Sequence, residues 1–427
     1  MITFCDYMEQ ALYGPLGYYF AGTAQSGKNG DYFTAPEVGA AFGQLLAEIF
    51  LGWKEKLDWP DFSLIEVGAG EGRLVKDILK QHPFRYIAVE RSPARRSFLE
   101  PIRAEFPNLL EVHSGLEALQ GLSGVLFANE LIDAFPVHRV RMKNGRLEEA
   151  YVGEGQSVRP RSKAKVGQTP WSAPAMKWDS PSTPRLAAYF DRIHIALPEN
   201  YETEVNLAMA DWLKAAAGVL AKGVVVLIDY GRPAHEYYAA ERNNGTLRCF
   251  GKHGVYDPFD VIPAGRRPAP HTAGGPGRQS CGDPGSIMMD PPSATEASVD
   301  ARQRSSGWAP EAAGDDVLKD WTSDVDFTSL ALDAKAAGFV PLVFMEMGTF
   351  LLEGLELLQK RAGERESGRA RENASTAHAP TLPRSLALRY LLHPEGLGSA
   401  FHVLVVGQGI DPADWVFAHN RLSRLGL

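Results

Sequence analysis

Two short stretches of the chain combine glycines and carboxylates at spacings that suit cofactor chemistry. Gly68, Gly70 and Gly72 alternate with other residues directly after an apolar segment, and Glu66 precedes them. Glycine lets the main chain come close to a ligand, and the start of a following helix supplies free N–H groups. Glu90 lies about twenty residues downstream, where an acid accepts hydrogen bonds from both ribose hydroxyls. The pattern predicts a site for an adenosine-bearing cofactor.

The order of residues in the glycine loop narrows the choice of cofactor. A P-loop needs Gly-Lys followed by Ser or Thr, and this loop continues with Glu71-Gly72-Arg73 instead. A dinucleotide fold prefers G-x-G-x-x-G, whereas Gly68-Ala69-Gly70-Glu71-Gly72 is G-x-G-x-G. An acid two residues before such a loop favours S-adenosylmethionine, because Glu66 is suited to pair, directly or through water, with the positive amino-acid end of that cofactor. The alternative is that the glycines serve only a tight turn.

A second group of polar residues follows the apolar segment 124–128. Asn129, Glu130 and Asp133 come directly after it, so we expect them to face the ligand crevice at the carboxyl ends of parallel strands, with Asn129 on the cofactor side. Carboxylates can orient a guanidinium by paired hydrogen bonds and later help to remove a proton. Glu130 is the best candidate for that clamp. Asp133 is either a second carboxylate or an acid that shapes the loop and the helix start.

Two more pairs of residues are candidates near the same crevice. Thr34 and Glu37 lie in a turn that could close over the cofactor. The same turn has the form of a capping box, and both interpretations are compatible because a helix start would offer N–H groups to the cofactor's carboxylate. Asp229 and Tyr230 end another apolar segment. Asp229 is either a substrate-side acid or a polar residue that terminates a strand.

These residues require a parallel sheet to bring them together, and the remaining sequence predicts one. Short apolar strands alternate with helical periodicity, which is typical of an α/β fold with helices on both faces of a parallel sheet. The expected strands are 64–67, 86–90, 110–113, 124–128, 224–229 and 401–407, and the expected helices are 41–51, 74–80, 93–105 and 207–220. We expect Thr3 to cap a helix near the N-terminus.

The domain organisation follows from where this rhythm breaks. Residues 1–60 form a predicted N-terminal helical segment that contributes to the cofactor site. Residues 61–257 and 317–427 form a predicted Rossmann-like domain with substrate-side additions. Three polar stretches, 158–184, 258–316 and 361–383, have little apolar periodicity, and we expect them to be disordered insertions.

Composition excludes several classes of function. The 427 residues carry a formal net charge of -8, which argues against a nucleic-acid groove. The three cysteines have no metal-ligand spacing and suggest no disulfide framework, so we expect no metal and a reducing, cytoplasmic location. No apolar run approaches the length of a membrane span, and the N-terminus does not resemble a signal peptide. Arg139 and Arg141 lie in a predicted hairpin, where a solvated strand face is favoured over a nucleic-acid patch.

Several motifs in a fixed order resemble one family of proteins. They begin with Ile2-Thr3-Phe4 and Gly17-Tyr18-Tyr19 and end with Pro394-Glu395-Gly396-Leu397-Gly398. Between them lie G-D-Y-F-T-A-P-E-V at 30–38, A-N-E-L-I-D-A-F-P-V at 128–137, I-D-Y-G at 228–231, G-T-L-R at 245–248 and D-W-T-S-D-V-D-F at 320–327. In these residues the chain resembles the MidA family, the bacterial relatives of the mitochondrial complex I assembly factor that methylates an arginine.

The resemblance implies a class I methyltransferase fold, S-adenosylmethionine as cofactor and a protein substrate. The implied acceptor is an arginine in a subunit of a respiratory NADH dehydrogenase. The sequence does not decide whether the protein forms a homodimer. Two departures make the substrate less determined than the cofactor: Asp324 stands where the family has histidine, and Trp321 where it has isoleucine. Other methyl acceptors, an NAD-dependent oxidoreductase and an assembly chaperone without catalysis remain alternatives.

Overall fold

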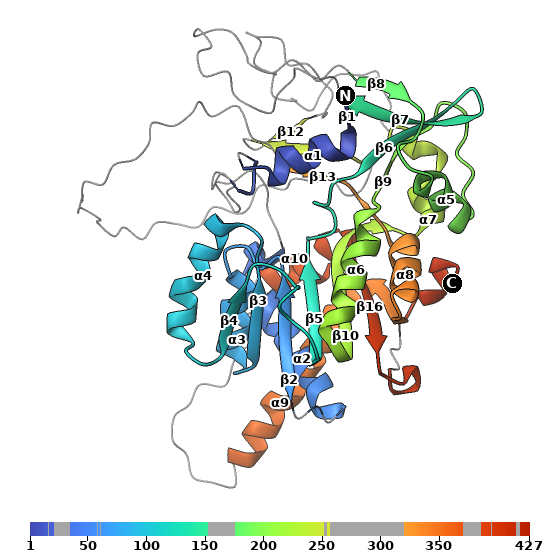
Figure 1. Ribbon diagram of the computed structural model, residues 1–427. Helices are drawn as coiled ribbons and strands as arrows, with labels where there is room; N and C mark the ends of the chain where they lie inside the picture. Colours follow the sequence, from blue (N-terminus) through green and yellow to red (C-terminus); the bar gives the residue numbers. More distant parts are fainter. Residues whose placement is uncertain are drawn as a thin grey trace, which may run out of the picture.

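The structure is a computed structural model. It describes residues 1–15, 17–20, 35–57, 59, 61–152, 176–251, 254–256, 320–369, 386–393, 395–415 and 419–427 (Figure 1). Thr34 lies outside the described residues, as do the expected insertion 258–316 and most of the other two. Two of the expected insertions include residues that form a strand or a helix in the structure. Met176–Asp179 forms strand β8 inside 158–184, and helix α9 (Met347–Arg369) continues into 361–383.

An eight-stranded sheet forms the centre of the protein and confirms the predicted α/β class. Its strands follow the order β15-β16-β10-β5-β2-β3-β4, and β14 pairs with the end of β10. The central pairs are parallel, whereas β16 is antiparallel to both of its neighbours. The strands are β2 (Phe62–Val67), β3 (Arg85–Val89), β4 (Leu110–His113), β5 (Leu122–Asn129), β10 (Leu220–Arg232), β14 (Val325–Asp326), β15 (Val340–Glu346) and β16 (Phe401–Gln408).

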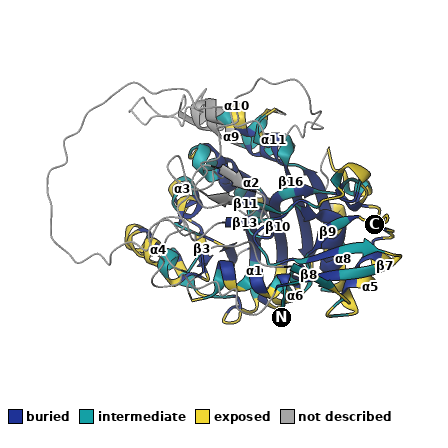
Figure 2. Ribbon diagram, turned by 90° about the horizontal axis from the view of Figure 1, so that it is seen from above, coloured by how far each residue is buried: buried dark blue, intermediate teal, exposed yellow. Residues whose placement is uncertain are grey.

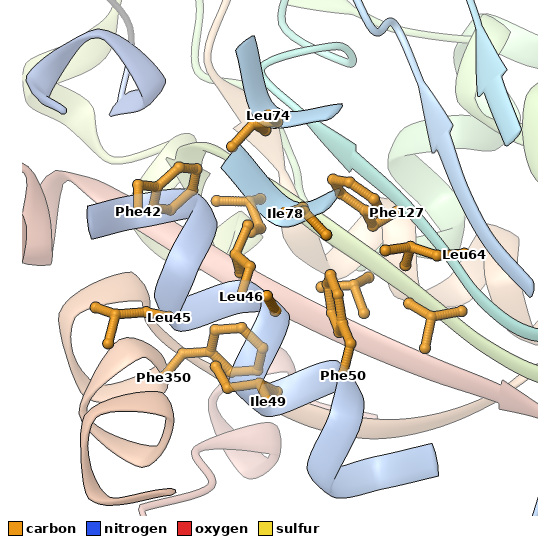
Figure 3. Packing of buried hydrophobic residues seen from close by; sticks show 14 of the residues in the cluster. Phe42, Leu45, Leu46, Ile49, Phe50, Leu64, Leu74, Ile78, Phe127 and Phe350 are labelled. Carbon is orange, nitrogen blue, oxygen red and sulfur yellow. The ribbon is translucent and has the colours of Figure 1, made fainter. Parts of the chain in front are cut away.

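Alternating side chains of these strands build one hydrophobic core on each face of the sheet. In β5, Phe127 belongs to the first core and Leu126 to the second, as the two-residue period of a strand requires. The first core lies against α2 (Ala41–Lys56), α3 (Arg73–Gln81) and α9, and the rings of Phe50 in α2 and Phe127 in β5 have centroids 5.3 Å apart (Figure 3). The second core lies against α6 (Ala208–Val219) and α8 (Phe327–Ala336). The central strands β2, β5, β10 and β16 are therefore largely buried on both sides (Figure 2).

The starts of helices α1 and α4 follow local capping rules. Thr3 caps α1 (Phe4–Tyr13) in a capping box with Asp6, which confirms that prediction. Ser92 caps α4 (Pro93–Glu105), since its side chain accepts a hydrogen bond from the N–H of Arg95 and a proline follows it. These caps fix the chain direction directly after β1 and β3, so the residues just before each helix have defined positions.

Two smaller antiparallel sheets and α1 lie together at one end of the large sheet (Figure 1). The first contains β1 (Ile2–Thr3), β6 (His138–Lys143), β7 (Arg146–Val152), β8 and β9 (Glu202–Val205), and the second contains β11 (Arg248–Gly251), β12 (Gly254–Tyr256) and β13 (Asp320–Thr322). Contacts from α1 reach β6, β7 and β13. The remaining helices are α5 (Arg185–Arg192), α7 (Ala234–Tyr237), α10 (Leu386–Leu392) and α11 (Leu397–Ala400).

The hairpin of β6 and β7 is confirmed, but its predicted solvated face is partly wrong. The guanidinium of Arg139 is buried and donates to Glu204 and Glu202, each at 2.9 Å. A buried charge needs such partners, and both come from β9, which the sequence did not predict. None of the helices among the described residues combines the length and the apolar character that a membrane crossing requires.

Candidate functional site

The predicted site residues meet because four parallel strands end at the same edge of the sheet. The glycine loop follows β2, Glu90 follows β3, Glu130 follows β5, and Asp229 lies near the end of β10. In the sheet β2 lies between β3 and β5, and β10 is the next strand beyond β5. Crevices at the carboxyl ends of parallel strands are where such folds bind ligands. The fold thus brings together residues that are separated by more than a hundred positions in the sequence.

The glycine loop has a shape that only glycine adopts without strain. Gly68, Gly70 and Gly72 have φ angles of 80°, 55° and 79°. A Cβ on Gly72 would lie 2.5 Å from side-chain carbons of Leu99 and Ile102, so this glycine is needed for packing against α4. A Cβ on Gly70 would meet no atom closer than 3.6 Å among the described residues. The main chain at Gly70 is therefore open to a ligand, while Gly72 and the buried Ala69 hold the turn.

The carboxylate of Glu90 is fixed against the glycine loop. Its Oε2 accepts a hydrogen bond from the N–H of Gly70 at 2.8 Å, and its Oε1 accepts one from the N–H of Ser92 at 2.7 Å. A carboxylate has about four acceptor positions, so these two bonds leave capacity for ribose hydroxyls. The residues present therefore fit an adenosine-bearing cofactor at this loop.

Glu66 lies deeper than the loop itself. Its side chain is buried, and its Oε2 accepts a hydrogen bond of 2.6 Å from the hydroxyl of Tyr86. Burial raises the pKa of Glu66 to about 7, although the Tyr86 hydroxyl opposes the rise. An acid in this position would become fully ionised when a positive group approaches, because an opposite charge lowers its pKa.

Glu130 occupies the centre of the site in an unusual backbone conformation. Its φ angle is 51°, a left-handed value that is uncommon outside glycine. Its Oε1 accepts hydrogen bonds from the N–H of Ala35 at 3.1 Å and from the amide of Asn129 at 2.9 Å, and its Oε2 accepts one from the hydroxyl of Tyr230 at 3.3 Å. Burial raises the pKa of Glu130 to about 7. Backbone strain of this kind clusters at functional sites, which makes Glu130 a candidate functional residue.

Two neighbours of Glu130 extend the site toward the predicted cofactor. The Oδ1 of Asn129 is buried and makes no hydrogen bond within the part of the chain that the structure describes, which leaves an acceptor for a ligand. Ala35 begins a short 3-10 helix, Ala35–Val38, that carries Glu37. The side chain of Glu37 is almost fully buried, with an oxygen 3.9 Å from a guanidinium nitrogen of Arg73 at the start of α3.

Asp229 and Asp133 have different roles in the structure. Asp229 accepts hydrogen bonds from the main-chain N–H groups of Ile132, Asp133 and Tyr230, so it anchors the loop after β5. These three bonds favour the strand-terminating interpretation over direct substrate contact. Burial and the charge of Glu130 raise the pKa of Asp229 to about 8, and burial followed by the charges of Asp229 and Glu130 raises the pKa of Asp133 well above its usual value.

Three site residues escaped the sequence reasoning. Asp320 at the start of β13 is buried, and its charge contributes to the raised pKa of Asp133. The hydroxyl of Tyr19 donates to Oδ1 of Asp320 at 2.6 Å, and the hydroxyl of Tyr13 donates to the carbonyl of Ala134 at 2.8 Å. The two tyrosine rings stack with centroids 5.4 Å apart. Their only signal was the resemblance of short motifs, which carries no spacing that predicts chemistry.

We call Glu130, Asp133, Asp229 and Asp320 the acid cluster. The main influences on the pKa values of Glu130, Asp133 and Asp229 are burial, neighbouring carboxylates and hydrogen bonds, and no cation is among them. Among the described residues no group of His, Cys, Asp and Glu side chains has the arrangement of a metal site. The cluster therefore favours a positively charged organic group, which would relieve the mutual repulsion of the carboxylates.

Comparison with known proteins gives consistent matches. A family model of S-adenosyl-L-methionine-dependent methyltransferases, Methyltransf_28, matches residues 45–263. The chain is 28% identical over 298 residues to the mitochondrial protein arginine methyltransferase NDUFAF7 homolog of Drosophila melanogaster, covering 60% of this chain and 62% of that protein. The mouse protein arginine methyltransferase NDUFAF7 is 38% identical over 80 residues, which is 18% of each chain. The chain thus spans less than two thirds of the length of these relatives.

Solved structures show the same fold over nearly the whole chain. A COG1565 superfamily member from Burkholderia thailandensis, bound to S-adenosyl-homocysteine, has a TM-score of 0.68 at 24% identity and covers 98% of this chain and 91% of its own. A native structure of a COG1565 protein from the same organism has a TM-score of 0.65 at 21% identity, with the same coverage. At these identities the likeness establishes the fold, which agrees with the predicted class I arrangement.

Proposed function

Because this chain belongs to the Methyltransf_28 family of S-adenosyl-L-methionine-dependent methyltransferases, we propose that it methylates an arginine side chain of a protein. The enzyme class and the cofactor follow from the family. The identity of the methyl acceptor is the part that we propose. It is supported by the names of the Drosophila and mouse relatives, both protein arginine methyltransferases, and by the acid cluster at the carboxyl ends of β5 and β10.

The cofactor lies, in this proposal, along the glycine loop between the strand ends. The open main chain at Gly70 and the carboxylate of Glu90 would hold the adenosine end, and Glu66 would face its positive amino group. The Oδ1 of Asn129, which has no hydrogen-bond partner among the described residues, is a further acceptor. S-adenosylmethionine supplies an electrophilic methyl group bound to a positively charged sulfur.

The observation that carries the choice of acceptor is the position of Glu130, which is half-buried beside the buried carboxylates of Asp133 and Asp229. A guanidinium is always charged in water, and removing it from water is costly unless carboxylates pair with it. Glu130 and Asp133 would orient the guanidinium by charge-assisted hydrogen bonds. The nitrogen that gains the methyl group must lose a proton, and a carboxylate whose pKa is about 7 is well suited to accept it.

The physiological substrate is a further part of the proposal. The resemblance to the mitochondrial assembly factor suggests a subunit of a respiratory NADH dehydrogenase, modified in the cytoplasm. Asp324, which stands where the family has histidine, has its carboxylate oxygens 3.4 Å from a guanidinium nitrogen of Arg242 and 3.3 Å from one of Arg248. The substitution is therefore accommodated by ion pairs and does not argue against an arginine acceptor.

A labelling experiment tests the acceptor directly. Purified enzyme is incubated with methyl-labelled S-adenosylmethionine and a protein extract from cells that lack it, and labelled proteins are digested and analysed by mass spectrometry. We expect methylarginine in a small number of proteins, and at least a hundredfold less with an enzyme carrying Glu130→Gln. Label on lysine, or in small molecules alone, would show that the acceptor is different while leaving the enzyme class intact.

A further inference from the structure

A chain of hydrogen bonds connects the glycine loop to the acid cluster through Tyr19. The N–H of Gly70 donates to one oxygen of Glu90, and the N–H of Ser92 donates to the other. The hydroxyl of Ser92 donates to the carbonyl oxygen of Tyr19 at 2.7 Å, and the hydroxyl of Tyr19 donates to Asp320 at 2.6 Å. The main chain and the side chain of one tyrosine thus bridge two parts of the site that different strands supply.

The ring of Tyr19 is held firmly in this position. It stacks on Tyr13 and meets the edge of Tyr18 with ring centroids 5.1 Å apart. The guanidinium of Arg95 lies 4.9 Å from the centroid of the Tyr19 ring, which is the geometry of a cation–π contact. Arg95 also carries the nearest atom to the position that a Cβ on Gly70 would take. Tyr19 therefore reaches the glycine loop by a second route, through Arg95.

Burial increases the contribution of these hydrogen bonds to the geometry of the site. Ser92 is 1% exposed and Asp320 is 3% exposed, so water cannot readily replace a lost partner at either end of the bridge. Hydrogen bonds in such surroundings are stronger than in water, and a chain of them reinforces its members. Ser92 also caps α4, which means that its hydroxyl is already fixed by the N–H of Arg95.

We propose that Tyr19 is a positioning residue, which fixes the carboxylate of Glu90 against the glycine loop by anchoring it, through Ser92, to Asp320. Methyl transfer requires two bound groups at close contact and in line, so the distance between the cofactor side and the acceptor side must be fixed. Tyr19 is the residue that spans this distance. The inference depends on S-adenosylmethionine binding, which the family establishes, and not on arginine as the acceptor.

The test measures binding of S-adenosylhomocysteine by calorimetry to four forms of the full chain. They are the unaltered protein, Tyr19→Phe, Asp320→Asn and the double variant. Tyr19→Phe keeps the ring and removes only the hydroxyl, and we expect it to weaken binding about fivefold to tenfold. This is less than the full contribution of a hydrogen bond to a charged group, because Tyr19 acts on the ligand only through Ser92 and Glu90. In the Asp320→Asn background the same change should cost less, because the charged acceptor is already gone.

A matched control separates positioning from general stability. The hydroxyl of Tyr201 is also part-buried and donates to a carbonyl, that of Ala239, at 2.9 Å. We expect Tyr201→Phe to change the affinity for S-adenosylhomocysteine less than twofold, whatever it does to the melting temperature. If Tyr19→Phe does not fold, Ser92→Ala breaks the neighbouring link and should weaken binding similarly.

Two results would overturn the proposal. One is an affinity for S-adenosylhomocysteine that stays within twofold in both Tyr19→Phe and Ser92→Ala. The other is an equal effect of Tyr19→Phe in the two backgrounds, since independent sites act additively. Neither result bears on the acceptor, which the labelling experiment decides separately, and a different acceptor would leave this binding experiment unchanged.

Discussion

The carboxylate of Glu130 accepts a hydrogen bond of 3.1 Å from the main-chain N–H of Ala35, 95 positions earlier in the sequence. Ala35 begins the turn that the sequence predicted to close over the cofactor, and Glu130 is the proposed clamp for the acceptor. One carboxylate therefore contacts both halves of the site. Among the described residues, Oε1 accepts hydrogen bonds from Ala35 and Asn129, and Oε2 accepts the longer bond from Tyr230.

The first prediction concerns Glu130→Gln. The amide keeps an oxygen that can accept from Ala35, but it has no charge to pair with a guanidinium and cannot accept a proton. We expect the rate of methyl transfer to fall about 10²–10⁴-fold, the usual contribution of a positioned base, while S-adenosylhomocysteine affinity changes little. Single-turnover transfer and calorimetry measure the two quantities. Glu117→Gln, an exposed acid, is the control, and unchanged transfer in Glu130→Gln would exclude the clamp.

The second prediction is a pH profile for transfer. The pKa of Glu130 is raised to about 7, so the carboxyl is protonated below this pH and charged above it. Only the charged form can pair with a guanidinium and accept its proton. We expect kcat/KM to rise between about pH 6 and pH 8 and then level off, since this ratio reports the free enzyme. The rise should be absent from the residual activity of Glu130→Gln. If kcat/KM of this variant rises over the same pH range, the titration belongs to another group.

The third prediction concerns stability and Glu66. Its pKa in the folded protein is about 7 against 4.5 for the ordinary side chain, so the folded state binds more protons between these values. Stability is therefore greatest below about pH 4.5 as far as this group is concerned, and it is lost as pH rises through 7. Glu66→Gln should be more stable than the unaltered protein at pH 8 by up to about 3 kcal/mol, and by much less at pH 5.

Urea unfolding at the two pH values measures this difference. The amide of Glu66→Gln can still accept from Tyr86, so the comparison removes the charge and keeps the hydrogen bond. A stability gain of the same size at pH 5 and pH 8 would contradict the explanation, because it would not depend on ionisation.

The fourth prediction compares two glycines with similar backbone angles. Gly72 has a φ of 79° and Gly121 a φ of 68°, but a Cβ on Gly72 would lie 2.5 Å from Leu99 and Ile102, whereas one on Gly121 would meet no described atom within 4 Å. Gly121→Ala should cost about 1 kcal/mol from backbone strain alone. Gly72→Ala should cost about 2–4 kcal/mol, because overpacking is added. Chemical denaturation measures both, and equal losses would show that the contact with α4 relaxes freely.

Local patterns predicted where several of the candidate residues lie in the fold. The bounds 93–105 and 110–113 agree with α4 and β4, and Glu130 follows its strand as expected. Glu90, expected as the last residue of strand 86–90, lies directly after β3, which ends at Val89. The bond between Tyr19 and Asp320 joins residues 301 positions apart, and no local pattern indicates it. Arg139 was placed on a solvated face for the same reason, because its partners Glu202 and Glu204 lie more than sixty positions away.

One missed strand has a local cause. Strand β15 contains Pro341, and its pairing with β16 shifts register between Pro341 and Val343. Proline cannot donate to a ladder and is tolerated at a sheet edge, which is where β15 lies. The irregularity obscures the strand in the sequence, although its side chains are largely buried.

The position of β16 has a consequence for how the protein is made. Phe401–Gln408 lies between β10 and β15, so the edge of β10 from Gly223 to Tyr230 has no partner there until the ribosome has passed Gln408. By then the glycine loop and Glu130 have long been synthesised. During translation the unpaired backbone edge of β10, next to the future site, stays available for pairing with other chains. Pairing of β16 with β10 and β15 then completes this part of the sheet.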